Sequence, residues 1–196
     1  MKKTKTIRFV ESFIILPIMT IMTPFGAISN TGVNVINQPQ VAFVVSADQQ
    51  IDQALKLKAD AIDAYFAEHD MPLEGTGMKM VEEAEKNDID WRLLPAIAVR
   101  ESTGGKFACK KVKNNSFGWG SCKIGFKSVD GAIETVAKNL GGNNPKTAKH
   151  YDNKSIKQIL RAYNPPSIVP KYAEQVMAIM NSIGDSEIAV ISSSTT

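Results

Sequence analysis

The sequence has few residues that could bind a metal ion. Among its 196 residues there are only two cysteines and two histidines. Cys109, Cys122, His69 and His150 are scattered along the chain without the spacing that zinc ligands share. We therefore expect neither a metal site nor another cofactor.

The chain also lacks a basic excess outside its first 47 residues. The formal net charge is +3, and four basic residues and one acidic residue within 1–47 account for all of it. Residues 48–196 have 19 basic and 19 acidic residues. A nucleic-acid-binding domain needs a basic face, so we expect no nucleic-acid partner.

No apolar run in the sequence reaches the length of about 20 residues that a membrane-spanning helix needs. The run from Phe13 to Met22 is interrupted by Pro17 and follows a basic start. This pattern is typical of a secretory signal peptide, and Val45-Ser46-Ala47 offers a possible cleavage point. We expect residues 1–47 to be a signal peptide or an N-terminal anchor with a linker. The remainder is then extracytoplasmic, secreted or in the cell envelope, and contacts a membrane only through an uncleaved leader.

Most of the remaining chain has apolar residues at helical spacing, which predicts about six helices. They lie at about 48–69, 76–87, 91–103, 129–140, 156–163 and 170–184. Residues 106–127 lack this pattern, so we expect an irregular lobe with at most a short β-hairpin over 116–126. The sequence thus predicts one all-α domain over residues 48–184, followed by a disordered tail at 185–196.

The two cysteines enclose the irregular lobe. An oxidising compartment permits a disulfide between Cys109 and Cys122. Closing a loop of about 14 residues stabilises a fold by about 3 kcal/mol. We predict this disulfide, and two buried free thiols are the alternative.

One carboxylate lies at an unusual position. Trp91, Leu94, Ala98 and Glu101 recur at helical spacing, so Glu101 shares a face with residues expected in a core. Gly104 fits the C′ position, which places Glu101 in the last turn, where the helix macrodipole disfavours an anion. Burial and the dipole both raise the pKa of a carboxyl group, as a general acid near neutral pH requires. A boundary residue whose carboxylate reaches water is the alternative.

The lobe after Glu101 has side chains suited to binding a glycan. Phe117 and Trp119 could stack on the apolar face of a sugar, or could pack in the core. The neighbouring residues Asn114, Asn115 and Ser116 could form hydrogen bonds with hydroxyl and acetamido groups. Five lysines suit an anionic polymer or form a solvated face: Lys106, Lys110, Lys111, Lys113 and Lys123.

Three segments together resemble known glycan-cleaving enzymes. The run Leu94-Pro95-Ala96-Ile97-Ala98-x-x-Glu101-Ser102 resembles the catalytic helix of the lysozyme-like superfamily, which includes lytic transglycosylases, goose-type lysozymes and bacterial glucosaminidases. Asn114-Asn115-Ser116-Phe117-Gly118 is similar to a segment of the family 73 β-N-acetylglucosaminidases, which are mannosyl-glycoprotein endo-β-N-acetylglucosaminidase-like. Arg161-Ala162-Tyr163-Asn164-Pro165 resembles the Ala-Tyr-Asn segment of the transglycosylases.

The resemblance implies a lysozyme-like fold and a glycosidase that cleaves the β-1,4 glycan strand of peptidoglycan, with Glu101 as the catalytic acid. The resemblance and the residue types together predict five substrate-binding residues: Ser102, Asn115, Phe117, Trp119 and Tyr163. The Gly-Leu-Met-Gln segment that usually follows the Glu in transglycosylases is absent. Its absence favours the glucosaminidase branch, whereas the Tyr163 segment favours the transglycosylases.

The identity of a second catalytic group is open at this stage. A glycosidase needs a second carboxylate or the acetamido group of its substrate, and Asp130, Glu134 and Asp152 are the acids available downstream. We expect a monomer in which Glu101 acts alone. The alternatives are a lytic transglycosylase that leaves 1,6-anhydro ends and a non-catalytic peptidoglycan-binding module. A thiol peptidase that pairs a cysteine with His150 is incompatible with the predicted disulfide.

Overall fold

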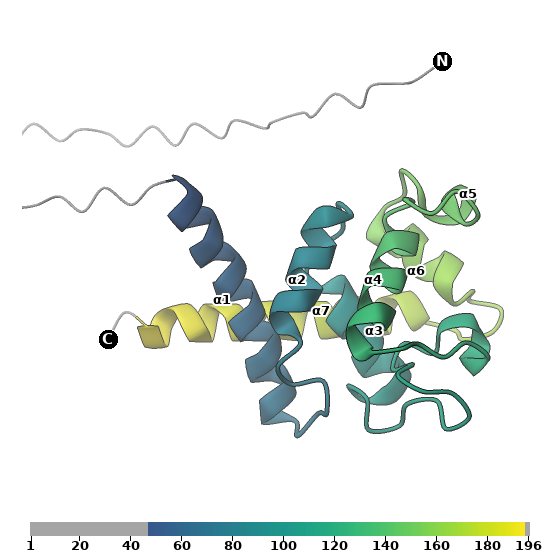
Figure 1. The fold of residues 1–196 in the computed structure, drawn as a ribbon, viewed down its shortest axis with the longest axis horizontal. Helices are drawn as coiled ribbons and strands as arrows, with labels where there is room; N and C mark the ends of the chain where they lie inside the picture. Colours follow the sequence, from purple (N-terminus) through teal and green to yellow (C-terminus); the bar gives the residue numbers. More distant parts are fainter. Residues whose placement is uncertain (1–46, 195–196) are drawn as a thin grey trace, which may run out of the picture. The chain divides into compact units, whose positions relative to one another are not determined.

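The structure, a computed structural model, describes residues 47–194 (Figure 1). The predicted leader, apart from Ala47, lies outside the described residues. Within them the chain forms seven α-helices and one 3₁₀ turn and no strand, so the all-α prediction is confirmed. The elements are α1 (Ala47–Glu68), α2 (Gly77–Lys86), α3 (Leu93–Ser102), η1 (Trp119–Cys122), α4 (Val129–Leu140), α5 (Ala148–Tyr151), α6 (Ile156–Tyr163) and α7 (Tyr172–Ser194).

Helix α3 is the centre of the core. Its residues Leu93, Leu94, Ala96, Ile97 and Ala98 are all fully buried, as expected for a helix that is apolar on every face. Helices α2, α4 and α7 pack against it, and α7 also packs against α1 and α6. Figure 1 shows α7 running across α1, α2 and α3. The site therefore begins on a helix whose position is fixed by hydrophobic burial.

The start of α3 accommodates a proline. Residues 91 and 92 form a turn, and the helix begins at Leu93 with Arg92 as its N-cap, two residues after the expected start at about residue 91. The Asp90 carboxylate accepts a hydrogen bond from the Arg92 backbone N–H at 2.9 Å. Pro95 then lies in the first turn, where a backbone N–H has no intrahelical partner. The turn at residues 91 and 92 and the helix start at Leu93 therefore accommodate Pro95.

The end of α3 turns the chain sharply into the lobe. Thr103 is left-handed, with φ 51°, one residue before the predicted position Gly104. Gly104 is also left-handed, and its N–H donates to the Ala98 carbonyl at 3.2 Å. A Cβ at Gly104 would lie 2.5 Å from the Met71 sulfur. Only glycine fits this exit from the helix.

The lobe, α5 and the end of α7 show where the predicted elements agree with the structure and where they differ. The lobe is irregular as predicted, but the short hairpin allowed over residues 116–126 is not present, and the turn η1 lies in that segment. Helix α5 lies within a segment predicted as loop, because four residues are too few to show a helical period. Helix α7 continues to Ser194 past Gly184, which was predicted to end it, and 185–194 is helical rather than a disordered tail. Gly184 does not adopt the left-handed conformation that ends helices.

Candidate active site

Glu101 lines a cavity of about 660 Å³. The last turn of α3 contributes Glu101, and the lobe contributes residues 118–122. Helix α5 and the end of α6 supply further lining residues, and the loop after α6 supplies Pro165 and Ile168. Segments that lie far apart in the sequence therefore meet around one carboxyl group.

The Glu101 carboxyl group is half-buried and held by a phenol. Its Oε1 accepts a hydrogen bond from the Tyr172 hydroxyl at 2.6 Å. Burial raises the pKa of Glu101, while the Tyr172 hydrogen bond and the Arg100 charge oppose part of this rise. The net direction is upward, as predicted from the sequence. A carboxyl group with a raised pKa retains its proton to higher pH and can act as an acid.

Gly118 lets the lobe approach this carboxyl group closely. A Cβ built on Gly118 would lie 2.7 Å from Glu101 Oε2, closer than real Cβ contacts. Gly118 is also left-handed, with φ 62°, which disfavours a side chain independently. The backbone of the lobe thus forms one wall around Glu101.

Tyr172 was not predicted as a site residue. It is the first residue of α7, is 2% exposed, and stacks on the Tyr163 ring at 6.1 Å with an interplanar angle of 7°. The Arg100 guanidinium lies 5.7 Å from the centre of its ring. Burial and the Glu101 charge raise the pKa of Tyr172 strongly, so the phenol stays protonated as a donor. The only sequence signal was that a buried tyrosine needs a partner for its hydroxyl.

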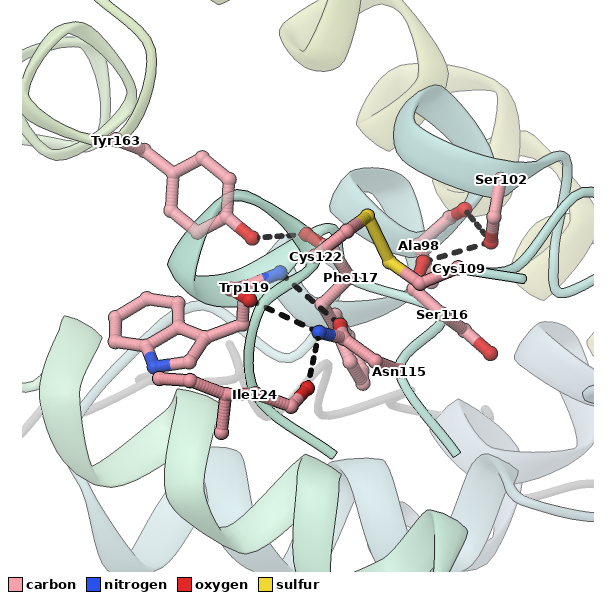
Figure 2. Close-up of a disulfide and its surroundings, with 10 residues drawn as sticks. All are labelled: Ala98, Ser102, Cys109, Asn115, Ser116, Phe117, Trp119, Cys122, Ile124 and Tyr163. Carbon is pink, nitrogen blue, oxygen red and sulfur yellow. Dashed lines mark hydrogen bonds between the residues drawn. A yellow bond between two sulfur atoms is a disulfide. The ribbon is translucent and has the colours of Figure 1, made fainter. Parts of the chain in front are cut away.

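Two of the predicted substrate-binding residues, Trp119 and Tyr163, line the cavity. Their ring centres lie 5.7 Å apart with planes tilted by 51°. Figure 2 shows the two rings side by side. The Tyr163 hydroxyl donates a hydrogen bond to the Phe117 carbonyl, which ties α6 to the lobe. This aromatic wall lies on the side of the cavity formed by the lobe and α6.

Ser102 occupies a different place from the predicted one. It is buried, and its single O–H is shared between the Ser116 and Ala98 carbonyls, at 2.7 and 3.1 Å from Oγ (Figure 2). The same oxygen accepts a hydrogen bond from the Gly105 N–H at 3.0 Å. Ser102 therefore joins the lobe to α3 and does not line the cavity.

Asn115 and Phe117 are likewise internal rather than facing the cavity, and both are fully buried. The Asn115 Nδ2 donates to the Trp119 and Ile124 carbonyls at 2.9 and 2.8 Å, and its Oδ1 accepts from the Trp119 N–H at 3.0 Å (Figure 2). Phe117 belongs to the hydrophobic core. These residues were predicted to contact substrate. In the structure they position Gly118 and Trp119, which do line the cavity.

The predicted disulfide is present. Cys109 and Cys122 are bonded with their Cα atoms 5.5 Å apart, and neither thiol is free. Cys122 lines the cavity, directly after the segment that carries Trp119. The disulfide therefore closes the loop that forms one wall, and a cysteine nucleophile is not available.

Glu101 is the one acidic residue among the described residues that line this cavity. Glu134 forms an ion pair with Lys79 at 2.6 Å and lines a different pocket. Asp130 and Asp152 are exposed and do not line the cavity. His150 does line it, from α5. The titratable side chains at the cavity are thus one carboxyl group, one imidazole and the tyrosines of its wall.

Further searches of the described residues found no group of three or more histidine, cysteine or acidic side chains that could hold a metal ion. Within the same residues no helix is both long and apolar enough to span a membrane. No known family model matches the chain. A search of curated proteins also found no match. The site itself and the three sequence motifs are therefore what indicate a function.

Proposed function

We propose that this chain is an exported glycosidase that hydrolyses a β-1,4 bond between N-acetylglucosamine and N-acetylmuramic acid in peptidoglycan. The observation that carries the proposal is the Glu101 carboxyl group, half-buried with a raised pKa, on a cavity bordered by Trp119 and Tyr163. The three lysozyme-like motifs support it, since Glu101 and Tyr163 come from two of them and meet at the same cavity. The disulfide is compatible with export.

In the proposed mechanism Glu101 gives its proton to the glycosidic oxygen of the leaving sugar. The Tyr172 hydroxyl, which donates to Oε1, stabilises the carboxylate that remains. That carboxylate then acts as the base toward the attacking nucleophile. The rings of Trp119 and Tyr163 offer apolar surface for a sugar face, which a pyranose presents through its C–H groups.

The single carboxyl group at the cavity limits which group can fill the second catalytic role. Inverting and most retaining glycosidases use two carboxyl groups, and no second one lines the cavity in the part of the chain that the structure describes. We therefore assign the second role to the acetamido group of the substrate. The same observation favours a second candidate, a lytic transglycosylase in which the sugar 6-hydroxyl attacks and leaves a 1,6-anhydro end.

Digestion of purified peptidoglycan tests the proposal. Wild type, Glu101→Gln and the control Glu134→Gln, whose carboxylate is exposed and lines another pocket, are compared for newly released chain ends. We expect Glu101→Gln to lose activity by about 10²–10⁴-fold, the contribution typical of a general acid. The control should retain wild-type activity.

The products identify the bond that is cut. Mass analysis showing N-acetylglucosamine at the new reducing ends indicates a glucosaminidase, N-acetylmuramic acid indicates a muramidase, and anhydro ends indicate a transglycosylase. Binding of wild type to peptidoglycan without any new ends contradicts the enzyme proposal. That result would favour a non-catalytic peptidoglycan-binding module.

A further inference from the structure

The lobe beside the cavity has an unbalanced charge. Between Glu101 and Asp130 there are no acidic residues. The same stretch has six lysines, and all of them are exposed: Lys106, Lys110, Lys111, Lys113, Lys123 and Lys127. The domain as a whole has equal numbers of basic and acidic residues, so this stretch is a local concentration of positive charge.

These lysines differ from those on the first two helices. Lys56 pairs with Asp60, Lys58 with Glu85, and both Lys79 and Lys86 with Glu83. None of the ion pairs found among residues 48–185 involves a lysine of the lobe. Helices α1 and α2 thus neutralise their lysines internally. In the lobe Lys106 donates a hydrogen bond to the His69 carbonyl at 3.0 Å, and the other five lysines form no ion pair among the described residues.

The fold gathers the lobe lysines into two neighbouring groups. The disulfide holds Cys109 and Cys122 with Cα atoms 5.5 Å apart, so the residues that follow them, Lys110 and Lys123, lie on adjacent segments. The Phe126 N–H donates to the Lys113 carbonyl at 3.0 Å, which brings Lys127 close to Lys113 along the backbone. We call Lys110, Lys111, Lys113, Lys123 and Lys127 the lysine cluster. Unpaired like charges at this density repel one another, and an anionic partner would remove that repulsion.

The lysine cluster is continuous with the cavity wall. Lys123 directly follows Cys122, and Cys122 lines the cavity. Thr147 and His150 also line the cavity, and the exposed residues Lys146 and Lys149 directly precede them in the chain. Exposed lysines are therefore sequence neighbours of cavity-lining residues in two separate segments, the lobe and the segment around α5.

We infer that the lysine cluster binds negatively charged groups attached to the glycan strand in the cavity, so that the substrate is an anionic rather than a neutral β-1,4 glycan. This inference rests on the proposed function for the identity of the strand. The required chemistry is a series of closely spaced anions. In bacterial walls it is provided by carboxylates of the peptide stems or by phosphodiester polymers attached to the strand.

Co-sedimentation with insoluble polymers tests the inference, using the chain with Glu101→Gln so that cleavage does not alter the polymer. Lys110→Gln/Lys123→Gln is compared with the control Lys56→Gln/Lys86→Gln. The control removes the same charge from side chains that are 65% and 69% exposed on α1 and α2. The polymers are intact walls, walls stripped of phosphate polymers by acid, and neutral chitin.

We expect the Lys110/Lys123 variant to bind intact walls at least about tenfold more weakly, since each lysine near an anionic surface contributes about fivefold in affinity. The control should bind as wild type. Raising the salt concentration from about 0.1 M to about 1 M, which shortens the Debye length from about 10 Å to about 3 Å, should weaken wild-type binding to walls but not to chitin. If binding to stripped walls is retained, the peptide-stem carboxylates are the anions that the lysine cluster binds. If it is lost, the phosphodiester polymers are those anions.

Equal binding of the variant and wild type to walls overturns the inference. It is also overturned if wild type binds walls independently of salt and binds chitin equally tightly. Should the variant fail to fold, as judged by its melting temperature and disulfide content, the salt dependence of wild type decides alone. A protein that binds walls through the lysine cluster but releases no chain ends contradicts the proposed function and leaves the anion-binding surface supported.

Discussion

Helix α3 and the lobe over residues 103–127 meet at Glu101 but are held in place by different forces. Helix α3 is surrounded by apolar contacts, and five of its side chains are fully buried. In the lobe, Phe117 is the fully buried apolar side chain, and the backbone is held by the hydrogen bonds of Asn115 and by the disulfide. Non-directional burial fixes the helix, and directional or covalent bonds fix the lobe.

Because of this difference, one region determines the position of Glu101 and the other determines its chemical surroundings. Helix α3 determines where the backbone of Glu101 lies, because the core around it is shared with α2, α4 and α7. The lobe determines the surroundings of the carboxyl group, through Gly118 against Oε2 and Trp119 in the cavity wall. Damage to the lobe should therefore reduce activity more than it reduces helical structure, with one exception.

That exception is Phe117, the point where the lobe joins the helical core. Replacing Phe117 by alanine should destabilise the protein by about 3–5 kcal/mol, because it leaves a cavity among fully buried side chains. Phe107→Ala is the matched control, since Phe107 belongs to the same lobe and is 73% exposed. Its change in unfolding free energy should stay within about 0.5 kcal/mol. Urea denaturation measures both free energies of unfolding. Equal losses of stability in the two variants would show that Phe117 does not join the lobe to the helical core.

Removal of the disulfide should have the next largest effect. Cys109→Ser/Cys122→Ser opens a loop with a sequence separation of 13 and should cost about 3 kcal/mol. We expect the far-ultraviolet circular dichroism at 25 °C to keep its helical signal, because Phe117 is the one fully buried side chain that the loop contributes to the core shared by helices α1 to α4 and α7. Peptidoglycan cleavage should fall, since Cys122 lines the cavity.

A reductant distinguishes the disulfide from other consequences of the substitutions. Wild type treated with a dithiol should lose activity to the level of the double serine variant, and the variant should lose nothing further. Retention of full activity by reduced wild type would show that hydrogen bonds alone hold the wall.

The sequence predicts these two regions to different degrees. Apolar periodicity located α1, α2, α3, α4 and α6, because helices packed on one core repeat every 3.6 residues. It could not find α5, which has a single turn, or the continuation of α7 beyond Gly184. In the lobe the cysteines predicted the disulfide, but the absence of a period left the turn η1 without a signal.

At the site the sequence identified positions better than orientations. Glu101 was recognisable because a carboxylate on an apolar face is rare. Asn115 and Ser102 were expected to point toward a substrate, and both are turned inward to bond the lobe backbone. Tyr172 lies 71 residues from Glu101, and the contact between them depends on how α7 packs against α3. A local pattern has no information about such a contact.

Gly118→Ala tests the close approach of the lobe to Glu101. The added Cβ would lie 2.7 Å from Oε2, so the carboxyl group or the lobe must move. We expect a loss of activity of about 10²-fold, the effect of misplacing a catalytic group by about 1 Å. Gly75→Ala is the control, because Gly75 is also left-handed, with φ +85°, and has open space around its Cβ position.

Both glycine variants should lose about 1–2 kcal/mol of stability from the left-handed backbone alone. Only Gly118→Ala should lose activity, measured as kcat/KM on peptidoglycan. Equal activity losses in the two variants would assign the effect to backbone strain rather than to the contact with Glu101.

The smallest effect is expected for Tyr172→Phe, which removes one hydrogen bond and leaves the ring stacked on Tyr163. That bond lowers the pKa of Glu101, against the larger upward effect of burial. Its loss should therefore raise the pKa further, and the fall of kcat/KM on the alkaline side should move to higher pH. At the pH optimum we expect a loss of about tenfold or less, as for one hydrogen bond of about 1 kcal/mol. Tyr65→Phe, on α1 away from the cavity, should leave the profile unchanged.

The same change has a consequence for stability, measured as the pH dependence of the unfolding free energy. Because the pKa of Glu101 is higher in the folded protein than in the unfolded chain, the folded state binds more protons between these two values. Stability contributed by protonated Glu101 is therefore present below the unfolded pKa and is lost as the pH rises through the folded pKa. Tyr172→Phe should extend this loss to higher pH, whereas Glu101→Gln should abolish it. A pH profile of kcat/KM and of stability that Tyr172→Phe leaves in place would show that the phenol does not tune the carboxyl group.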